Sequence, residues 1–271
     1  MAGRRRLKLI GVSVIAAAFA LIAATANRVS ATDWRTASHE PVGLAPDPAT
    51  TPEPVVQVYA ARTWGWRGTF GVHTWIAVKR ADAPAFTVYE VIGWHLRWSD
   101  SVVVARQRDA DARWFGSPPE LLADKRGEGV EALIGRIEAA VRGYPFAGEY
   151  SVWPGPNSNT FTAWVLRHAP ELQADLPPTA IGKDYLGERI VASAPSGSGV
   201  QFSLGGVLGI LASHVEGLEV NLLGLTFGVN PFDFSLKLPL LGRIGPARRL
   251  EVGAAHSAPV TRAAPESPGA Y

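Results

Sequence analysis

The sequence predicts an α+β fold, an antiparallel sheet with packed helices, followed by a C-terminal Gly/Leu-rich β-hairpin region. Short runs rich in β-branched and aromatic residues come first, helical patterns follow them, and broken Gly/Leu-rich runs come last. Strands followed by helices are typical of this class. Of the 271 residues, 47% are hydrophobic, which is enough for one large core or two small ones.

Four strands are expected in the first part of the fold, over residues 55–59, 70–78, 86–92 and 101–105. The turn-like stretch 80–84 separates the second run from the third. These two runs are therefore interpreted as an antiparallel hairpin or meander.

Helical spacing is seen in 118–123 and in 130–142. In the second run one face is apolar, with Val130, Leu133, Ile134, Ile137 and Val141. Gly143 ends it. A further helical run begins near Phe161 and ends before Pro170.

After a loop over 177–185, the runs between 200 and 229 are rich in glycine and leucine. Glu216 and Glu219 interrupt them, so they are too broken for a membrane-spanning helix. They are interpreted as β-hairpin material that either packs on the domain or lies against a membrane.

These patterns divide the chain into five segments. They are a signal peptide or signal anchor, a Pro-rich tether, an α+β domain, a Gly/Leu-rich β extension and a disordered tail, over residues 1–26, 27–54, 55–185, 186–247 and 248–271.

The N-terminal segment predicts export from a bacterial cytoplasm. Four basic residues precede 18 uncharged residues, 9–26, which end in the small-x-small pattern of a signal-peptidase site. The same segment is just long enough to span a bilayer, so cleavage and anchoring both remain open. The basic residues hold the N-terminus inside in either case. The expected location is the cell envelope, inner-membrane anchored or periplasmic, with the membrane as a partner through this segment.

Composition argues against several other partners. The chain has 26 basic and 24 acidic residues; without the four basic residues of 1–26 the balance is 22 against 24, a net charge of −2. Nucleic acid is therefore not an expected partner, because its binding needs a clustered basic face. The absence of cysteine excludes disulfides, thiolate metal sites and a cysteine nucleophile. No metal-binding motif occurs, and neither a metal nor a cofactor is expected.

The most informative motif is the run 153–161, Trp-Pro-Gly-Pro-Asn-Ser-Asn-Thr-Phe. It places Ser158 at the N-terminus of a helix, where free backbone N–H groups favour negative charge. His73 lies in an expected strand and Glu90 in the next one. Ser158 as nucleophile, His73 as base and Glu90 as its orienting group are the candidate catalytic residues.

Each of these residues also has a purely structural interpretation. Ser158 beside two asparagines is typical of a helix N-cap. His73 can be a hydrogen-bonded core histidine, and Glu90 a charge at a strand edge. Candidate binding residues complete the site: Asn157, Asn159, Trp75, Trp153, Lys183 and Asp184. The tryptophans are included because an indole offers a wide apolar face and one donor.

Several runs carry a resemblance to known families. The run 157–161 resembles the Asn-Cys-Asn-x-Phe nucleophile motif of permuted papain-like hydrolases, the circularly permuted branch of the NlpC-type peptidase superfamily, with serine in place of cysteine. A wider set of runs resembles a bacterial family of unknown function, the one numbered 3750: 33–38, 71–75, 155–160, 177–185 and 217–224. The resemblance implies a permuted papain-like α+β domain and an envelope protein, with no activity to carry over.

Two classes of function follow. One is a catalytically silent papain-like module that binds envelope material such as peptidoglycan or lipid, or an envelope protein. The other is a serine-type hydrolase or acyltransferase that acts on envelope peptide or lipid amide or ester bonds. Serine is far less nucleophilic than cysteine when unassisted, which favours the silent module. Within the papain-like domain, His73 and Ser158 are expected to approach each other on one side of the sheet, although 85 positions separate them in the sequence.

Overall fold

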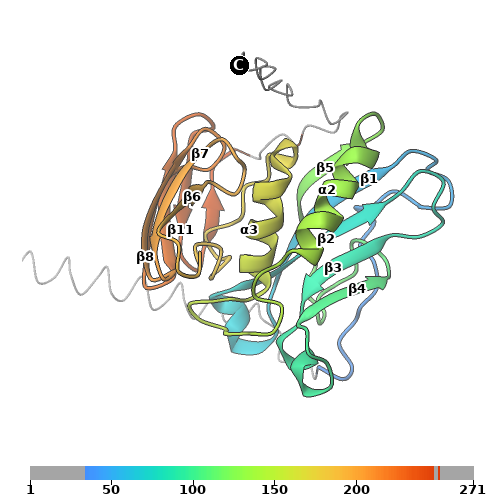
Figure 1. Ribbon diagram of the computed structural model, residues 1–271, viewed down its shortest axis with the longest axis horizontal. Coiled ribbons are helices and arrows are strands. Elements are labelled where there is room, and N and C mark those ends of the chain that lie inside the picture. The colour runs from blue at the N-terminus through green and yellow to red at the C-terminus, as the bar shows by residue number, and fades with distance from the viewer. Residues whose placement is uncertain (1–33, 247–249, 251–271) are drawn as a thin grey trace, which may run out of the picture.

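A computed structural model describes residues 34–246 and residue 250; the expected membrane segment 1–26 and nearly all of the expected tail lie outside them. The described chain is a mixed α/β structure, mostly β, with two antiparallel sheets and two α-helices (Figure 1). The coarse fold prediction is therefore confirmed. Within the described part, no helix is long and apolar enough to cross a membrane.

The first sheet has five strands in the order β4-β3-β2-β1-β5. The strands are β1 (Val55–Arg62), β2 (Val72–Lys79), β3 (Thr87–Val91), β4 (Val103–Gln107) and β5 (Glu120–Arg126). All four interstrand pairings are antiparallel. The first four strands overlap the runs expected from the sequence.

The strand β5 corrects a prediction, because residues 118–123 were expected to be helical. The apparent helical spacing spans fewer than two turns, which is too short to nucleate a helix on its own. Pairing with β1 satisfies the backbone instead, and β5 forms one edge of the sheet. The other two expected helical runs are present, as α2 (Val130–Arg142), which ends at Gly143 as expected, and as α3 (Ser158–His168).

One face of the first sheet is covered by α2 and by α3 (Ser158–His168). Their apolar sides pack against alternate residues of β2, including Ile76 and Val78. A 3-10 turn, η3 (Pro170–Leu172), follows α3. Two more 3-10 turns interrupt the strand connections, η1 (Gly65–Thr69) and η2 (Gly93–Arg97).

The opposite face of the same sheet holds a second core, built around Tyr59, Trp75 and Trp114. Part of the segment expected to be a tether contributes to this side. Pro41 forms a β-bridge with Ala112, and Ala45 packs against the second core. The described residues 34–54 therefore lie along the folded protein and do not extend freely away from it.

The second sheet lies within residues 186–247, the segment expected to form a β extension. Seven strands follow one another in sequence order: β6 (Val191–Ser193), β7 (Gly199–Leu204), β8 (Leu208–Ser213), β9 (Gly217–Leu222), β10 (Leu225–Asn230), β11 (Ser235–Leu238) and β12 (Gly242–Ile244). In Figure 1, α3 lies between this sheet and the first one. Arg167 of α3 reaches the second sheet, where it donates to Gln201.

Candidate functional site

The N-terminus of α3 is capped by side chains of its own first residues. The side-chain oxygen of Asn157 accepts from the backbone N–H of Asn159 at 2.9 Å and of Thr160 at 3.2 Å, and the Thr160 hydroxyl accepts from the Asn157 N–H. This is a reciprocal capping box. The N-cap is therefore Asn157, and Ser158 is the first residue of the helix. Two of the N–H groups that would stabilise an oxyanion are already bonded.

The two asparagines that flank Ser158 also tie three chain segments together. Asn157 donates to the carbonyl groups of Val152 and Ile181, and Asn159 donates to those of Val72 and Ile181. Both side chains are almost fully buried. Both residues were expected to bind a ligand, but these four hydrogen bonds from their side-chain amide groups are made to backbone carbonyl groups of the protein itself.

Ser158 and His73 lie on opposite faces of the first sheet. In β2, Thr74 points to the helix side, where its hydroxyl donates to the Ser158 carbonyl group and the Asn159 side chain. Because successive residues of a strand point to opposite faces, His73 points away from α3. Its ring stacks on Trp114 with centroids 3.6 Å apart, and Trp114 belongs to the core on the far side.

The expectation that Ser158 and His73 approach each other is therefore wrong. The reason is parity: residue 74 faces α3, so residue 73 cannot. The geometry does not provide the papain-like arrangement, in which the base and the nucleophile share one side of the sheet. The sequence motif 157–161 instead serves as a helix cap.

His73 does contact Glu90, the partner expected for it. His73 Nε2 lies 2.8 Å from Glu90 Oε2, and Glu90 also pairs with Arg106 at 2.8 Å and Arg108 at 3.6 Å. Burial lowers the pKa of His73, despite the opposing effect of Glu90. The hydrogen bond from His73 and the two arginines lower the pKa of Glu90 to about 2, although burial raises it. The pair is therefore a neutral imidazole that donates to an ionised carboxylate.

The remaining expected binding residues differ in their exposure. Trp75 is fully buried, and its Nε1–H donates to the Ala110 carbonyl group. Lys183 and Asp184 are buried as well. Only Trp153 is open to solvent, with 51% of its surface exposed, and its Nε1–H donates to the Leu223 carbonyl group in the β9–β10 turn.

Lys183 belongs to a buried quartet of charges beneath the second sheet, which the sequence did not reveal. Lys237 Nζ lies 2.6 Å from Asp175 Oδ1 and 2.7 Å from Glu219 Oε1, and Lys183 pairs with the other oxygen of Glu219. Nearby, Asn221 donates to Asp184 at 2.7 Å. The quartet holds two positive and two negative charges and is neutral as a unit.

The pKa values of the quartet reflect this pairing. Burial raises the pKa of Asp175 to about 6, although the ammonium group of Lys237 lowers it. Burial also favours a higher pKa for Glu219, but the charges and hydrogen bonds of Lys183 and Lys237 have the larger effect, so the pKa of Glu219 is lowered. The contacts attach the loop 175–184 to the inner side of β9 and β11.

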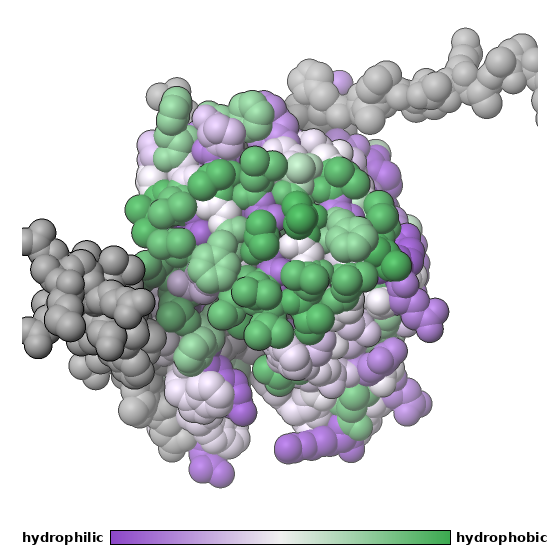
Figure 2. Space-filling view, turned by 90° about the vertical axis from the view of Figure 1, so that its left-hand side faces the viewer, coloured by the Kyte–Doolittle hydropathy of each residue, from purple (hydrophilic) through white to green (hydrophobic). Residues whose placement is uncertain are grey.

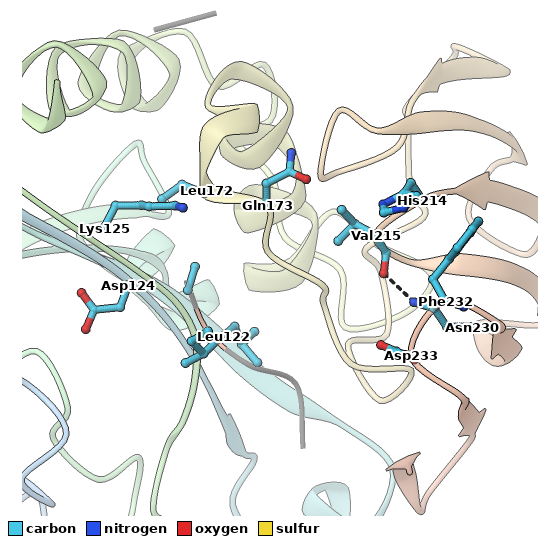
Figure 3. A pocket seen from close by; sticks show the side chains of 12 residues that line it. Leu122, Asp124, Lys125, Leu172, Gln173, His214, Val215, Asn230, Phe232 and Asp233 are labelled. Atoms are coloured by element: carbon cyan, nitrogen blue, oxygen red, sulfur yellow. Dashed lines mark hydrogen bonds between the residues drawn. The ribbon is translucent and has the colours of Figure 1, made fainter. Parts of the chain in front are cut away.

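A cavity of about 430 Å³ is separate from the candidate residues. Figure 3 shows that it lies between β5 and the second sheet, with Leu172 and Gln173 along one side. The His214 and Phe232 rings lie 4.4 Å apart at its far wall. Asp124 is bonded to Gln57 and to an arginine, so it does not offer a free carboxylate. None of the expected site residues lines this cavity.

The outer face of the second sheet is apolar, and we call it the apolar face. Its side chains are the outward residues of five consecutive strands: Val200, Phe202, Leu204, Leu208, Ile210, Leu218, Val220, Leu222, Leu225, Phe227, Val229 and Leu236. Figure 2 views this side, where hydrophobic residues cover most of the surface and charged residues gather at its edges. The inward residues of the same strands are largely polar, among them Gln201, Ser203, Asn221 and Thr226.

The fold and the site define a two-sheet α+β protein with a closed helix N-terminus and an apolar outer face. A family model described as "Protein of unknown function (DUF3750)" matches residues 53–185, which supports the resemblance to that family. The matched part covers the first sheet and both helices. Comparison with curated proteins and with solved structures gives no match.

Proposed function

We propose that this protein is a catalytically silent binding module of the bacterial cell envelope, held at the inner membrane by its N-terminal segment. The observation that carries the proposal is the position of His73 and Ser158 on opposite faces of the first sheet. A serine nucleophile needs a base within about 2.6–3.2 Å of its hydroxyl. No side-chain rotation carries an imidazole through a packed sheet.

The surroundings of Ser158 support the same conclusion. Asn157 already occupies the N–H groups of residues 159 and 160, which would otherwise form an oxyanion hole. Ser158 itself is almost completely buried. An acyl substrate at this position therefore has no histidine base on its side of the sheet, and the N–H groups of residues 159 and 160 are not free to donate to it.

The envelope location rests on the sequence of residues 1–26, which precede the described structure. The chain has no charged residue between 9 and 26 and four basic residues before them, a pattern typical of an exported or anchored protein. Peptidoglycan, lipid and another envelope protein are the candidate partners.

Two labels test catalytic silence. A serine-reactive fluorophosphonate should label wild type and Ser158→Ala equally weakly. Because the chain lacks cysteine, Ser158→Cys carries one thiol, as does the control Ala132→Cys on the exposed side of α2. The thiol at 158 should react with iodoacetamide more slowly than the control thiol. Ser158-dependent fluorophosphonate labelling, or a faster thiol at 158, contradicts catalytic silence.

The location is tested separately. Alkaline phosphatase fused after Pro54 should be active in a bacterial host, and the full chain should fractionate with membranes. An inactive fusion together with cytosolic protein contradicts the envelope part of the proposal and leaves the question of catalysis unaffected.

A further inference from the structure

We propose that the apolar face of the second sheet lies on the lipid bilayer, so that the partner of this binding module is the membrane surface itself. The inference rests on the proposed envelope location and names the partner within it. Two features of the described residues support it, the pattern of the sheet and the residues in its turns, and a third observation is the short length of chain between segment 1–26 and residue 34.

The first feature is the continuous apolar cover across the strands. Residues that pair across antiparallel strands point to the same side of a sheet. One such row holds Leu204, Leu208, Leu222 and Leu225, the next holds Val191, Phe202, Ile210, Val220 and Phe227, and a third holds Val200, Ala212, Leu218, Val229, Leu236 and Ile244, with Ser193 next to Val200. No charged residue occurs in these rows.

The extent of the cover reaches the upper end of the range for surface patches. The four central strands have six residues each, about 20 Å, and the seven strands span about 29 Å, so the face measures at most about 600 Å² in plan. The largest exposed patch of a soluble monomer reaches about 300–600 Å² of accessible surface and is often functional. Individual side chains here are well exposed; Ile210, for example, retains 59% of its surface.

The polarity of the sheet is inverted relative to a soluble half-buried sheet. The inward side is occupied by polar groups that pair with the loop 175–184, including Glu219 and Lys237. The apolar residues therefore cannot move to the inside by a change of register, because that would expose the polar set and break the buried quartet. The apolar side of this sheet therefore faces outward because its polar side is paired with the loop 175–184.

The second feature is the use of apolar residues where turns normally hold glycine or asparagine. Leu223 has φ +54° and Phe234 has φ +54°, a left-handed region that disfavours ordinary side chains. They are 64% and 85% exposed. Leu223 occupies the first position of a two-residue hairpin turn, which most often holds asparagine or aspartate. A turn that faces water gains nothing from these residues, whereas a turn in contact with lipid buries them.

Trp153 adds an aromatic residue at the edge of this face. Its indole N–H is bonded to the Leu223 carbonyl group, and half of the residue's surface is exposed. Tryptophan is enriched where apolar tails meet head groups, because its ring is apolar and its N–H is polar.

The third observation is the short chain between the expected membrane segment and the folded body. Seven residues, 27–33, separate segment 1–26 from residue 34, where the described structure begins. Seven residues span at most about 25 Å. Residues 34–54 then follow the folded protein, as described above. An anchor in the bilayer thus limits the distance between the body and the lipid surface; it does not by itself select the face that meets the lipid, because residues 41–45 lie on the side of the first sheet opposite α3.

A second copy of the chain is the main alternative occupant, and the composition of the face argues against it. Even homodimer interfaces are only about 65% apolar and carry hydrogen bonds. The three rows of the apolar face offer one polar side chain, Ser193, at their edge. A lipid surface requires no hydrogen bonds from the protein, so it fits a face of this kind.

Single labels in the full chain test the inference. Ile210→Cys and Phe227→Cys each introduce one thiol on the apolar face, and Ala132→Cys on α2 is the matched control; each is labelled with an environment-sensitive nitrobenzoxadiazole dye. The full chain is reconstituted into phosphatidylethanolamine and phosphatidylglycerol vesicles with or without doxyl-labelled lipid. Quenching by a lipid-borne group reports contact on either side of the vesicle, so protein orientation does not matter.

The expected result is blue-shifted emission and several-fold stronger lipid quenching at positions 210 and 227 than at 132. High salt should leave the quenching unchanged, because the face carries no charge. Blue-shifted emission without lipid quenching means that protein covers the face, either a second copy or residues 9–26, and overturns the inference. Emission typical of water at 210 and 227 overturns it as well.

Flotation of the same vesicles separates this inference from the proposed envelope location. Labelled protein that floats with the vesicles but is not quenched leaves the membrane anchor intact and removes only the lipid contact of the sheet. Protein that does not float contradicts membrane anchoring itself. Near-wild-type circular dichroism of each labelled variant shows that the fold is retained, which is expected because both positions are exposed.

Discussion

Replacing Lys237 by methionine tests the charge balance of the buried quartet. The Lys237 side chain is fully buried, and its ammonium group lies within 2.7 Å of both Asp175 and Glu219. Methionine keeps the apolar stem but removes the charge, which leaves one positive charge against two negative ones. Breaking a buried ion pair by removing one partner costs about 3–5 kcal/mol. Domains of this kind have about 5–15 kcal/mol in total, so the loss should be easily measured.

Two comparisons separate this effect from simple loss of packing. The double change Lys237→Met with Asp175→Asn restores neutrality, so its cost should fall below the sum of the two single costs by about 1–3 kcal/mol. Lys79→Met is the matched control: Lys79 is as deeply buried, but its ammonium group contacts two backbone carbonyl groups and no carboxylate.

The cost of Lys237→Met should also depend on pH. The pKa of Asp175 is raised to about 6 in the folded protein even with Lys237 in place, and removing that cation raises it further. As pH falls, Asp175 then takes up a proton and the unpaired charge disappears. The destabilisation should therefore be larger near pH 8 than near pH 5, whereas that of Lys79→Met should not change in this way.

Urea unfolding of the full chain in mild detergent, followed by tryptophan fluorescence, measures each free energy of unfolding. A loss below about 1 kcal/mol for Lys237→Met, or strict additivity in the double variant, refutes the description of the quartet as a coupled buried unit.

Two further changes probe the capped helix and the histidine pair. Gly182 has φ +94°, and a Cβ there would overlap the Asn157 side-chain amide, so Gly182→Ala should cost more than about 2 kcal/mol of unfolding free energy. Gly205→Ala, also at positive φ but with open space around the new Cβ, should cost only about 1 kcal/mol. Equal costs would show that the contact between Gly182 and Asn157 is not tight. For His73, the lowered pKa means that the folded state holds fewer protons than the unfolded one, so stability falls as pH drops below about 6.5. His73→Gln should flatten this part of the profile in urea unfolding, and an unchanged slope would contradict the neutral state assigned to His73.

Local sequence patterns predicted the elements that local physics controls. The helix over 130–142 and the first four strands follow from side-chain periodicity, which is set by the geometry of the backbone. The contact between His73 and Glu90 was also expected from their strand positions. The helix at residue 158 was anticipated as well, because asparagine and serine are typical cap residues. The short run 118–123 was misassigned because so few residues support either period.

Parity along a strand fixed that His73 and Thr74 point to opposite faces, but not which face carries α3. Only the tertiary structure decided this, by packing α3 against Thr74. The candidate catalytic pair required His73 and Ser158 to lie on the same face of the first sheet, and the structure places them on opposite faces. Sequence motifs of this length do not contain the information, because the position of a helix relative to a sheet depends on the whole core.

The same limit applies to the second sheet. Alternation of apolar and polar residues between 200 and 238 determined that its strands have two different faces. In a soluble protein the apolar face is normally the buried one. Here the loop 175–184 supplies Asp175, Lys183 and Asp184, which pair with the polar face and hold it inside, so the apolar face is left outside. Those partners lie far away in sequence, and only the folded chain brings them together.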